Sequence, residues 1–405
     1  MTSNISLYDH YSNLIRYESF PCLILDLDLF KKNINDVANR LKTHTNNTKT
    51  IRVASKSVRS IEVLKIILDS DDIFKGILSY SLREALFLHS KGFTDIVVAY
   101  PEINKNDLER FCTELHSQLI DITLMVDSID QVKIINEISS AHSVTVKISL
   151  DIDLSTKFGV LHFGVRRSPI NNVKSARFFA KEVKNYKNVE LVGLMGYEAQ
   201  IAGVPDKSPA KNFLINFLIR FLKKRSIKTI ISRRESIVKM LKNEGFNLIF
   251  INGGGTGSVE STGEETVVTE VTVGSGFYAP VLFDYYNTFK HHPSLFYALE
   301  VVRKPANNIY TCHGGGYVAS GSLGIDKIPQ PYLPENSGLL VNEMAGEVQT
   351  PVENKKHKLK IGDPVFMRHA KAGELCEHFN EIIAVSNASI VDRFKTYRGE
   401  GVIFL

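Results

Sequence analysis

Eight short apolar segments, each rich in β-branched residues, recur between residues 51 and 276, and helical patterns separate most of them. The patterns between them, such as "SIEVLKIILDS", space apolar residues three and four apart, as an amphipathic helix does. Near-continuous apolar strands that alternate with helices predict a parallel sheet covered on its faces. The eight segments are "IRVAS" (51–55), "GILSY" (76–80), "DIVVAY" (95–100), "ITLMVD" (122–127), "VTVKISLD" (144–151), "VELVGLMGY" (189–197), "NLIFING" (247–253) and "TEVTVGSG" (269–276).

Eight strands over roughly 225 residues favour a (β/α)8 TIM-type barrel, typically about 250 residues long, over a doubly wound open sheet. An earlier run, "PCLILDLDLF", predicts an entry strand that ends at Asp26 or Asp28 before the first helix. After about residue 290, short strands separated by Pro, Gly and Asn turns predict an all-β module. We therefore expect an N-terminal segment (1–20), the barrel (21–290) and a smaller all-β C-terminal domain (291–405).

Composition excludes several classes of function. The net charge is +5, and the densest basic runs, 221–236 and 353–360, are interpreted as solvated surfaces of a helix and a loop; a nucleic-acid partner is not expected. The four cysteines show no CxxC pairing, which fits a reducing compartment. The sequence shows no signal peptide and no apolar stretch of about 18 residues. The prediction is a soluble, cytoplasmic protein without a membrane partner. The segment 198–245 is long for one barrel connection and predicts a helix that covers another part of the protein or contacts a partner.

Three features lie where barrel strands end, the face on which such barrels carry their chemistry. Lys56 follows the first strand in "RVASKSVRS", "INGGGTGS" (251–258) ends the seventh and "TVGSGFY" (272–278) closes the eighth. Successive glycines let backbone N–H groups surround a phosphate. The alternatives are a solvated lysine and plain tight turns. The candidate phosphate ligands are Gly254, Gly255, Thr256, Gly274, Ser275 and Gly276.

Two further segments supply polar groups to the same rim. "FGVRRSPI" follows the fifth strand and "GLMGYEAQ" ends the sixth, which places Arg167, Tyr197 and Gln200 opposite Lys56. A lysine amine, a phosphate cradle and a polar ring suit a cofactor with an aldehyde at one end and a phosphate at the other. Pyridoxal phosphate is that cofactor.

With these motifs in order, the chain resembles the fold-type III pyridoxal-phosphate enzymes. The resemblance is to the branch of D-serine dehydratase, D-threonine aldolase and the deaminases with an alanine-racemase-like N-terminal domain. "FPCLILDLDLFKKNI" is similar to the opening of that family, and "RVASKSVRS", "GVRRSPI", "GYEAQ" and "NGGGTGS" to its later motifs. The resemblance implies that Lys56 is the Schiff-base lysine, that Arg167 partners the pyridine nitrogen, and that Gln200 stands where histidine is usual. It also implies that Tyr197 lines the cofactor and that Gly254, Gly255 and Thr256 bind its phosphate.

The segment "MRHAKAGELCEHFNE" departs from the metal-binding members of that family. His369 is kept, but Lys371 occupies the second ligand position, and a protonated lysine offers a metal no lone pair. Cys376, His378 or Glu374 would have to substitute, so a divalent metal stays an open question. His369 and Lys371 are alternatively expected to bind the substrate carboxylate.

"YTCHGGGY" places His313 and Cys312 as further polar groups near the site, with His313 a catalytic candidate beside Lys56 and Tyr197. The resemblance implies an enzyme that acts at the Cα of a free amino acid, expected to be of D configuration. Deamination or dehydration, aldol cleavage and racemisation are not distinguished. The alternatives are a non-catalytic pyridoxal-phosphate carrier and a phosphate-binding barrel enzyme without pyridoxal. We also expect a homodimer in which the β-rich domain packs against the barrel mouth of the second subunit.

Overall fold

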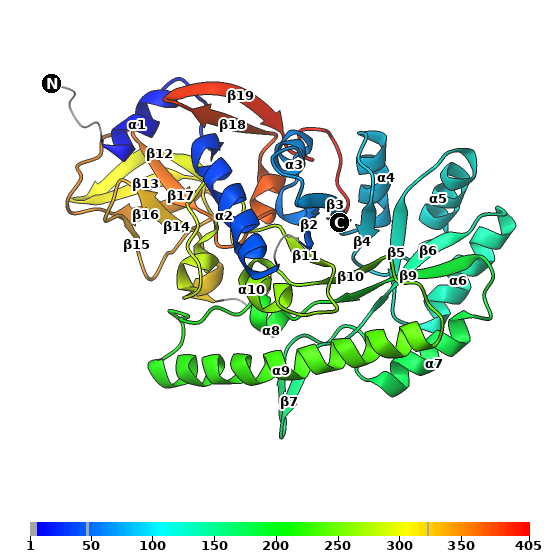
Figure 1. Ribbon diagram of the computed structural model, residues 1–405. Coiled ribbons are helices and arrows are strands. Elements are labelled where there is room, and N and C mark those ends of the chain that lie inside the picture. Colours follow the sequence, from blue (N-terminus) through cyan, green and yellow to red (C-terminus); the bar gives the residue numbers. More distant parts are fainter. Residues whose placement is uncertain (1–5, 46–47, 322–323) are drawn as a thin grey trace.

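The computed structural model describes residues 6–45, 48–321 and 324–405, and its larger part is a closed barrel of parallel strands (Figure 1). Neighbouring strands pair in parallel around the ring, and β11 closes it on β2. The predicted (β/α)8 barrel is confirmed, because an open doubly wound sheet would leave two unpaired edges. The barrel strands are β2 (Thr50–Ala54), β3 (Phe74–Ser79), β4 (Ile96–Val98), β5 (Ile122–Val126), β6 (Val146–Asp151), β9 (Val189–Gly196), β10 (Phe250–Gly253) and β11 (Glu270–Val273).

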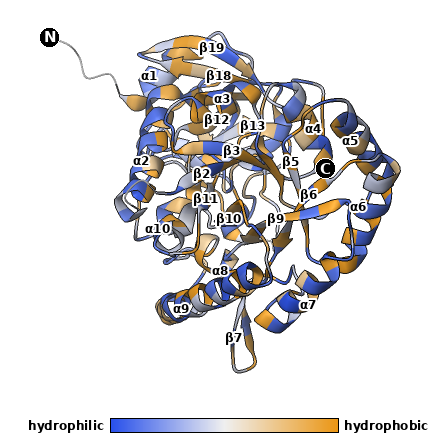
Figure 2. Ribbon diagram, turned by 45° about the vertical axis from the view of Figure 1, so that its right-hand side comes forward, coloured by the Kyte–Doolittle hydropathy of each residue, from blue (hydrophilic) through white to orange (hydrophobic). Residues whose placement is uncertain are grey.

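The apolar runs form strands because both of their faces are covered. Every residue of β4, β5, β10 and β11 is buried, and Figure 2 shows apolar strands inside helices of mixed polarity. Polar side chains start these helices: Ser128 and Gln131 form a capping box at the start of α6. The helices are α1 (Leu7–Leu14), α2 (Leu27–Thr45), α3 (Ile61–Leu68), α4 (Leu82–Ser90), α5 (Lys105–Ser117), α6 (Ile129–Ala141), α7 (Val173–Val183), α8 (Ala199–Ala202), α9 (Phe213–Asn243) and α10 (Val259–Gly263). In the described ranges, none of these helices has the length and apolarity that a bilayer crossing needs.

The remaining large sheet has nine strands, most of them antiparallel, and contains the C-terminal part of the chain. The predicted all-β texture after residue 290 is thereby confirmed. Its strands are β1 (Cys22–Asp26), β12 (Leu295–Ala306), β13 (Ile309–His313), β14 (Gln330–Leu333), β15 (Gly338–Leu339), β16 (Gln349–Glu353), β17 (Pro364–Arg368), β18 (Glu381–Ser386) and β19 (Ser389–Lys395).

The entry strand β1 belongs to this second sheet and not to the barrel. It pairs antiparallel with β12 and parallel with β18, so both of its edges are occupied. Leu23, Ile24 and Leu25 are buried, which explains a continuous apolar run outside the barrel. The chain then enters α2 and reaches the barrel at β2. The predicted boundary near residue 290 stays a prediction, and the sheet takes one strand from before it.

The segment 198–245 contains the predicted helix, the 31-residue α9. Figure 1 shows that α9 runs along the barrel and extends beyond it on the side of the second sheet. Near α9 lies a short hairpin of β7 (Thr156–Phe158) and β8 (Leu161–Phe163), which the sequence did not suggest. The Thr156 and Ser226 hydroxyls hydrogen-bond at 2.7 Å and tie this hairpin to α9.

Candidate active site

Lys56 lies in a single 3-10 turn, η1 (Ser55–Ser57), directly after β2. Its two serine neighbours are buried, whereas Lys56 is exposed. Its carbonyl accepts a hydrogen bond of 3.0 Å from Arg59 Nε, and Arg59 in turn pairs with Glu377 at 2.6 Å. The backbone of Lys56 is therefore fixed, while its amine stays accessible at the end of a barrel strand.

The glycine-rich loops after β10 and β11 contact each other and the Lys56 turn. The Gly276 N–H donates to Thr256 Oγ1 at 3.0 Å, and the hydroxyls of Ser275 and Ser57 lie 3.1 Å apart. Gly254 has φ +84°, which a glycine adopts without strain, and a Cβ on Gly276 would lie 2.7 Å from Thr256 Cγ2. The six predicted phosphate ligands therefore lie in loops that meet beside Lys56.

Tyr197 and Arg167 extend this group around the mouth. A Cβ on Gly255 would lie 3.2 Å from Tyr197 Cε2, so the ring packs on the first glycine-rich loop. The Arg167 guanidinium lies 5.5 Å from the centre of the Tyr197 ring and 5.9 Å from that of Tyr100. Burial raises the pKa of the Tyr197 hydroxyl to about 12, and Arg167 opposes this rise. Tyr197 is thus a neutral hydrogen-bond donor at ordinary pH.

Gln200 follows soon after Tyr197 in the chain and is buried. Its Nε2 donates to the Leu154 carbonyl at 2.7 Å, which holds the loop after β6 against the loop after β9. Within the described residues its Oε1 has no hydrogen-bond partner. This residue therefore joins two loops of the mouth and leaves one buried acceptor free.

A buried network of ion pairs supports the loop that carries Tyr197. Arg234 of α9 pairs with Glu198 at 3.0 Å and with Glu265, and Glu198 also accepts from the Ser258 hydroxyl at 3.0 Å. Arg234 is fully buried, so the interpretation of residues 221–236 as a solvated surface is wrong at this position. The network connects α9 with the loops that carry Tyr197 and Gly255.

Two carboxyl groups that sequence reasoning missed lie near each other, and one of them, Asp151, lies near Arg167. Burial raises the pKa of Asp151, at the end of β6, to about 7; nearby Asp127 adds to the rise and Arg167 opposes it. Burial also raises the pKa of Asp127. Their positions in the sequence could have revealed them, because Asp151 ends a barrel strand and Asp127 directly follows one, both at the carboxyl end.

The C-terminal segment after β17 packs directly on Lys56. Gly373 has φ +98°, and a Cβ there would lie 2.0 Å from the Lys56 carbonyl oxygen. Lys371 Nζ donates to the Ser320 carbonyl at 2.9 Å. Burial lowers the pKa of Lys371, and the ammonium groups of Lys327 and Lys56 lower it further, whereas Glu374 raises it. Lys371 therefore lies within electrostatic range of Lys56, Lys327 and Glu374.

The candidate metal ligands do not converge. His369 is 2% exposed, neither ring nitrogen has a hydrogen-bond partner of standard geometry among the described residues, and burial lowers its pKa to about 3. Cys376 Sγ faces the Val58 carbonyl at 3.6 Å, and His378 stacks on Tyr317 at 4.6 Å between ring centres. In the ranges that the structure describes, no three His, Cys, Asp or Glu residues are grouped to hold a metal ion. These residues do not fit a metal site.

His313 ends β13 opposite Gln349 and is exposed. No hydrogen bond or ring contact in the described parts joins it to Lys56 or Tyr197.

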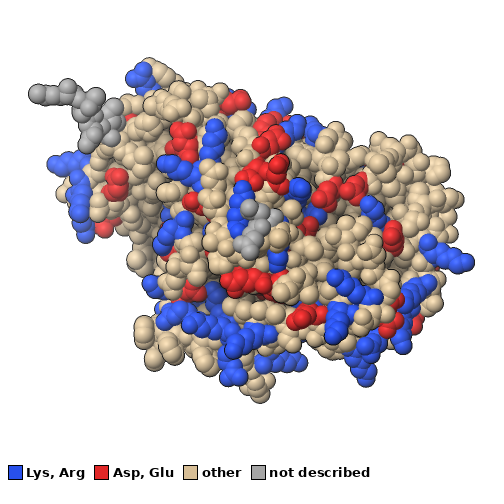
Figure 3. Space-filling model, viewed as in Figure 1, with Lys and Arg blue, Asp and Glu red and all other residues tan. Residues whose placement is uncertain are grey.

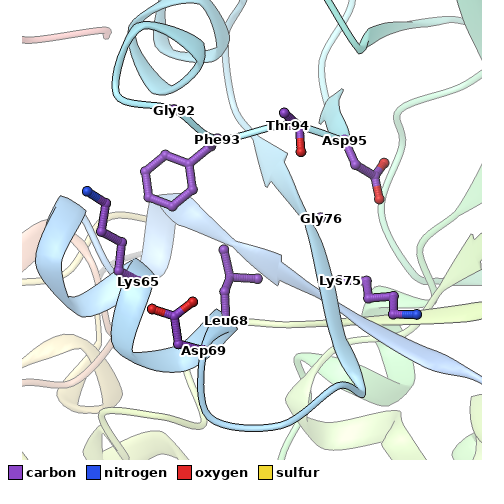
Figure 4. Close-up of a pocket in the computed structure, with 9 residues that line it drawn as sticks. All are labelled: Lys65, Leu68, Asp69, Lys75, Gly76, Gly92, Phe93, Thr94 and Asp95. Atoms are coloured by element: carbon purple, nitrogen blue, oxygen red, sulfur yellow. The ribbon is translucent and has the colours of Figure 1, made fainter.

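A depression of about 510 Å³ lies at the amino ends of β3 and β4, lined by residues that include Lys65, Lys75 and Asp95 (Figure 4). It is at the opposite end of the strands from Lys56 and contains none of the predicted site residues.

Comparisons with known proteins agree with this geometry. The model of the family "Alanine racemase, N-terminal domain" matches residues 25–279. The chain is 23% identical over 255 residues to 3-hydroxy-D-aspartate aldolase of Paracoccus denitrificans (strain Pd 1222), a match that spans 63% of this chain and 59% of that relative.

Solved structures share the fold over nearly the whole chain. D-threonine aldolase from Filomicrobium marinum superposes with a TM-score of 0.79 at 17% identity, covering 95% of this chain and 97% of that one. D-threo-3-hydroxyaspartate dehydratase from Delftia sp. HT23 superposes with a TM-score of 0.75 at 15% identity, covering 95% and 98%. Both alignments extend past the barrel into the second sheet.

Proposed function

Because this chain belongs to the alanine racemase N-terminal domain family, we propose that it is a pyridoxal-phosphate enzyme acting at the Cα of a free D-amino acid. By name, the relatives given above are two aldolases and one dehydratase of D-amino acids. Their named substrates share a hydroxyl on Cβ. A lyase for a β-hydroxy-D-amino acid, by aldol cleavage or dehydration, is our first choice of reaction, with racemisation as the second.

The observation that carries the proposal is the continuous set of contacts around the barrel mouth. It runs from Arg167 to Tyr197, through the glycine-rich loops, to the turn that carries Lys56. Bound there, pyridoxal phosphate supplies an electron sink that stabilises a carbanion at Cα. Lys56 is proposed to hold the cofactor through its aldehyde, and its amine would accept the Cα proton in dehydration or racemisation, whereas aldol cleavage needs a base for the proton of the β-hydroxyl.

The other residues of the barrel mouth are proposed to hold and orient the cofactor and the substrate. Backbone N–H groups of the two glycine-rich loops are proposed to bind the phosphate, and Arg167 to face the pyridine nitrogen. Lys371 is proposed to bind the substrate carboxylate, the group that every amino-acid substrate carries. His369 is buried and neutral, so it adds no charge to that interaction. His313 keeps the role of a candidate acid–base group from the second sheet.

The Lys56→Ala variant tests the proposal. The purified wild-type protein should show a visible absorption band, and borohydride should fix the cofactor mass on the peptide that contains Lys56. Lys56→Ala should lose the band and all turnover with an unchanged circular-dichroism spectrum, because the side chain is exposed. Lys65→Ala, at the opposite end of the barrel, is the matched control and should keep the band. A Lys56→Ala variant that retains the band would contradict the assignment.

The two alternatives give different results in the same measurement. A non-catalytic carrier would show the band, but β-hydroxy-D-amino acids would yield no aldehyde, oxo acid or ammonia. A phosphate-binding enzyme without pyridoxal would show no band at all. A screen of D- and L-amino acids, with chiral analysis of the recovered amino acid, distinguishes lyase from racemase.

We further propose that the protein works as a homodimer in the cytoplasm. Lys56 and Arg167 are exposed at the mouth, and a carbanion site needs cover from water. All four cysteines are buried with free thiols, a state that a reducing compartment preserves.

A further inference from the structure

The first turns of α9 expose a large apolar surface, which we call the apolar tip. Five side chains compose it, and each is between 48% and 74% exposed. Their spacing of three and four residues puts them on one face of the helix, opposite the buried Asn216 and Ile219. Single exposed apolar residues are common on folded proteins, whereas a contiguous group of large ones marks a binding surface. The residues are Phe213, Leu214, Phe217, Leu218 and Phe221.

Neighbouring contacts hold the apolar tip in helical form. Asn212 caps the helix by accepting from the Ile215 N–H at 2.9 Å. Asn216 exchanges hydrogen bonds of 3.1 Å with the backbone of Ser208. Further along the helix, Lys223 donates to the Asp206 carboxylate at 2.8 Å. The buried face of α9 is thus attached to the loop that precedes it, and the apolar tip is exposed on an already formed helix.

The helix carries positive charge directly after the apolar tip. Residues 207–234 contain no acidic side chain, and the exposed Lys224, Arg225 and Lys228 continue the same helix face. Figure 3 shows Lys and Arg gathered along the lower edge of the molecule, where Figure 1 places α9. A partner that complements this surface therefore combines apolar and anionic groups.

The chemistry of the apolar tip favours a lipid surface over a protein. Every exposed residue between positions 213 and 221 is apolar. A protein interface carries about one hydrogen bond per 100–200 Å², and none of these exposed side chains can form one. Two apolar tips paired with each other would bring their cations together, which is unfavourable. A bilayer needs no directional partner for apolar side chains, and its anionic headgroups attract Lys and Arg.

The order of these groups along α9 fits a helix end that enters one leaflet. In Figure 1 the N-terminal end of α9 extends past the barrel, so the apolar tip leads. Lys228 follows Phe221 by about 10 Å along the helix axis. Surface-bound helices bury their apolar side chains about 5–10 Å into the boundary between headgroups and acyl chains. The three cations can therefore stay at the level of the lipid phosphates while the phenylalanines enter the acyl region.

We propose that the apolar tip and the three cations after it attach the protein to the surface of an anionic membrane. The inference goes beyond the proposed function and does not depend on it, because it uses none of the residues assigned to the barrel mouth. The sequence predicted no membrane partner because it has no apolar stretch long enough to span a bilayer. Binding at the surface needs no such stretch.

Sedimentation with vesicles tests the apolar part of this surface on the full-length protein. The wild type should bind phosphatidylcholine vesicles that contain about 30% phosphatidylglycerol, and it should bind pure phosphatidylcholine about tenfold more weakly or worse. Phe217→Ser/Phe221→Ser should weaken binding to the anionic vesicles by about tenfold or more, because less apolar surface enters the leaflet. Phe178→Ser, which changes an exposed phenylalanine on α7, is the matched control and should bind as the wild type does. Unchanged binding by the double variant would overturn the proposal.

A charge reversal tests the basic part in the same assay. Lys224→Glu/Lys228→Glu should weaken binding to the anionic vesicles by about tenfold or more and leave the weak binding to phosphatidylcholine unchanged. Lys239→Glu/Lys242→Glu makes the same change of charge at exposed positions near the far end of α9 and should bind as the wild type does. Equal losses in the two variants would show that net charge alone attracts the protein, which contradicts a defined surface.

A tryptophan probe reports whether the apolar tip itself enters the bilayer. The chain contains no tryptophan, so a single introduced one reports only its own surroundings. The emission of Phe217→Trp should move to shorter wavelength on addition of anionic vesicles and should be quenched by lipids with brominated acyl chains. Phe178→Trp, at a position that is 65% exposed, should show neither change.

Two outcomes would replace the membrane by another occupant. A wild-type protein that does not bind anionic vesicles would overturn the proposal and favour an acidic protein as the partner. So would Phe217→Trp emission that lies at short wavelength without vesicles and moves to longer wavelength on dilution, because a second copy of the chain would then cover the apolar tip. Lys56→Ala should bind vesicles as the wild type does, so failure of the proposed function leaves this test intact.

Discussion

At the scale of single residues, the proximity of Lys56 and Lys371 decides what ligand the mouth favours. Burial is the main cause of the lowered pKa of Lys371, the ammonium groups of Lys327 and Lys56 add a smaller repulsion, and Glu374 opposes both. An anionic ligand between Lys56 and Lys371 relieves both the burial cost and the repulsion. A substrate carboxylate is such a ligand, which makes Lys371 a determinant of affinity.

Lys371→Ala should raise KM for the amino acid by roughly tenfold to a hundredfold, the loss of about 1.5 to 3 kcal/mol for a charged hydrogen bond. The exposed Lys360→Ala is the control and should leave KM unchanged. Because the pKa of Lys371 is lowered, its charge and the substrate affinity should be lost as pH rises through that pKa. About one tightly bound dication per chain, with activity lost on chelation, would argue for a metal in place of this lysine.

Glu84 predicts a pH dependence of stability. The carboxyl is buried and accepts from the Tyr80 N–H at 2.7 Å and the Tyr397 hydroxyl at 2.8 Å, and burial raises its pKa from 4.5 to about 7. Between these two values the unfolded chain is ionised while the folded chain holds its proton. Stability should therefore fall as pH rises from 4.5 to 7 and then level off, by about 3 kcal/mol from this group.

Urea unfolding of Glu84→Gln at pH 4 and pH 8 measures this contribution. The variant should lose most of that pH-dependent difference, whereas the exposed Glu137→Gln should keep it. An unchanged pH profile in Glu84→Gln would show that Glu84 titrates normally in the folded protein.

Sequence motifs pointed to residues that stand at strand ends beside serines, arginines or glycines. Lys56, Arg167 and Tyr197 are such residues, and the structure places them around the barrel mouth, while their roles stay predictions. Glu84 and Arg234 were missed, because a charged residue on a helix reads as solvated until its partner is known. Their partners, Tyr397 and Glu198, lie far away in the sequence.

At the scale of elements, the turn η5 (Glu374–His378) and the glycine before it attach the second sheet to the barrel. Gly373→Ala should strain the backbone, because φ is +98°, and also force its Cβ against the Lys56 carbonyl. Gly362→Ala is a matched control, with φ +92° and no atom within 4 Å. Backbone strain alone should cost about 1 to 2 kcal/mol in both variants. In urea unfolding, Gly373→Ala should lower the free energy of unfolding by more than Gly362→Ala does, and it should weaken cofactor binding about tenfold. Equal losses of stability in the two variants, with equal cofactor affinity, would contradict this packing.

The barrel strands were predictable because each is buried on both faces and therefore apolar throughout. All eight predicted runs correspond to β2–β6 and β9–β11, with ends shifted by a few residues. The strand β1 has the same composition, and only its long-range pairing with β12 and β18 assigns it to the other sheet. The β7–β8 hairpin was not predicted because it is short and its tip is exposed, so it carries little apolar pattern.

At the scale of the whole molecule, the position of β1 makes the two sheets one folding unit. β1 lies between β12 and β18 and runs directly into α2, which packs against α10 beside the barrel. Calorimetry of the full chain should give a single transition. Deletion of residues 1–26 should abolish soluble, cooperative folding, because it opens the centre of the nine-stranded sheet. Two separate transitions in the full chain would contradict the coupling.

The same placement of β1 sets an order of events on the ribosome. β1 emerges first, but β12 begins at Leu295 and β18 at Glu381, so at about 5 to 20 residues per second both partners follow only after tens of seconds. When β12 begins to emerge, the barrel already has all of its own strands, whereas the apolar β1 still lacks both of its partners. Until translation is nearly complete, nascent chains on neighbouring ribosomes of one mRNA can therefore exchange this unpaired strand. A premature stop codon before β18 would release a chain with that edge permanently open.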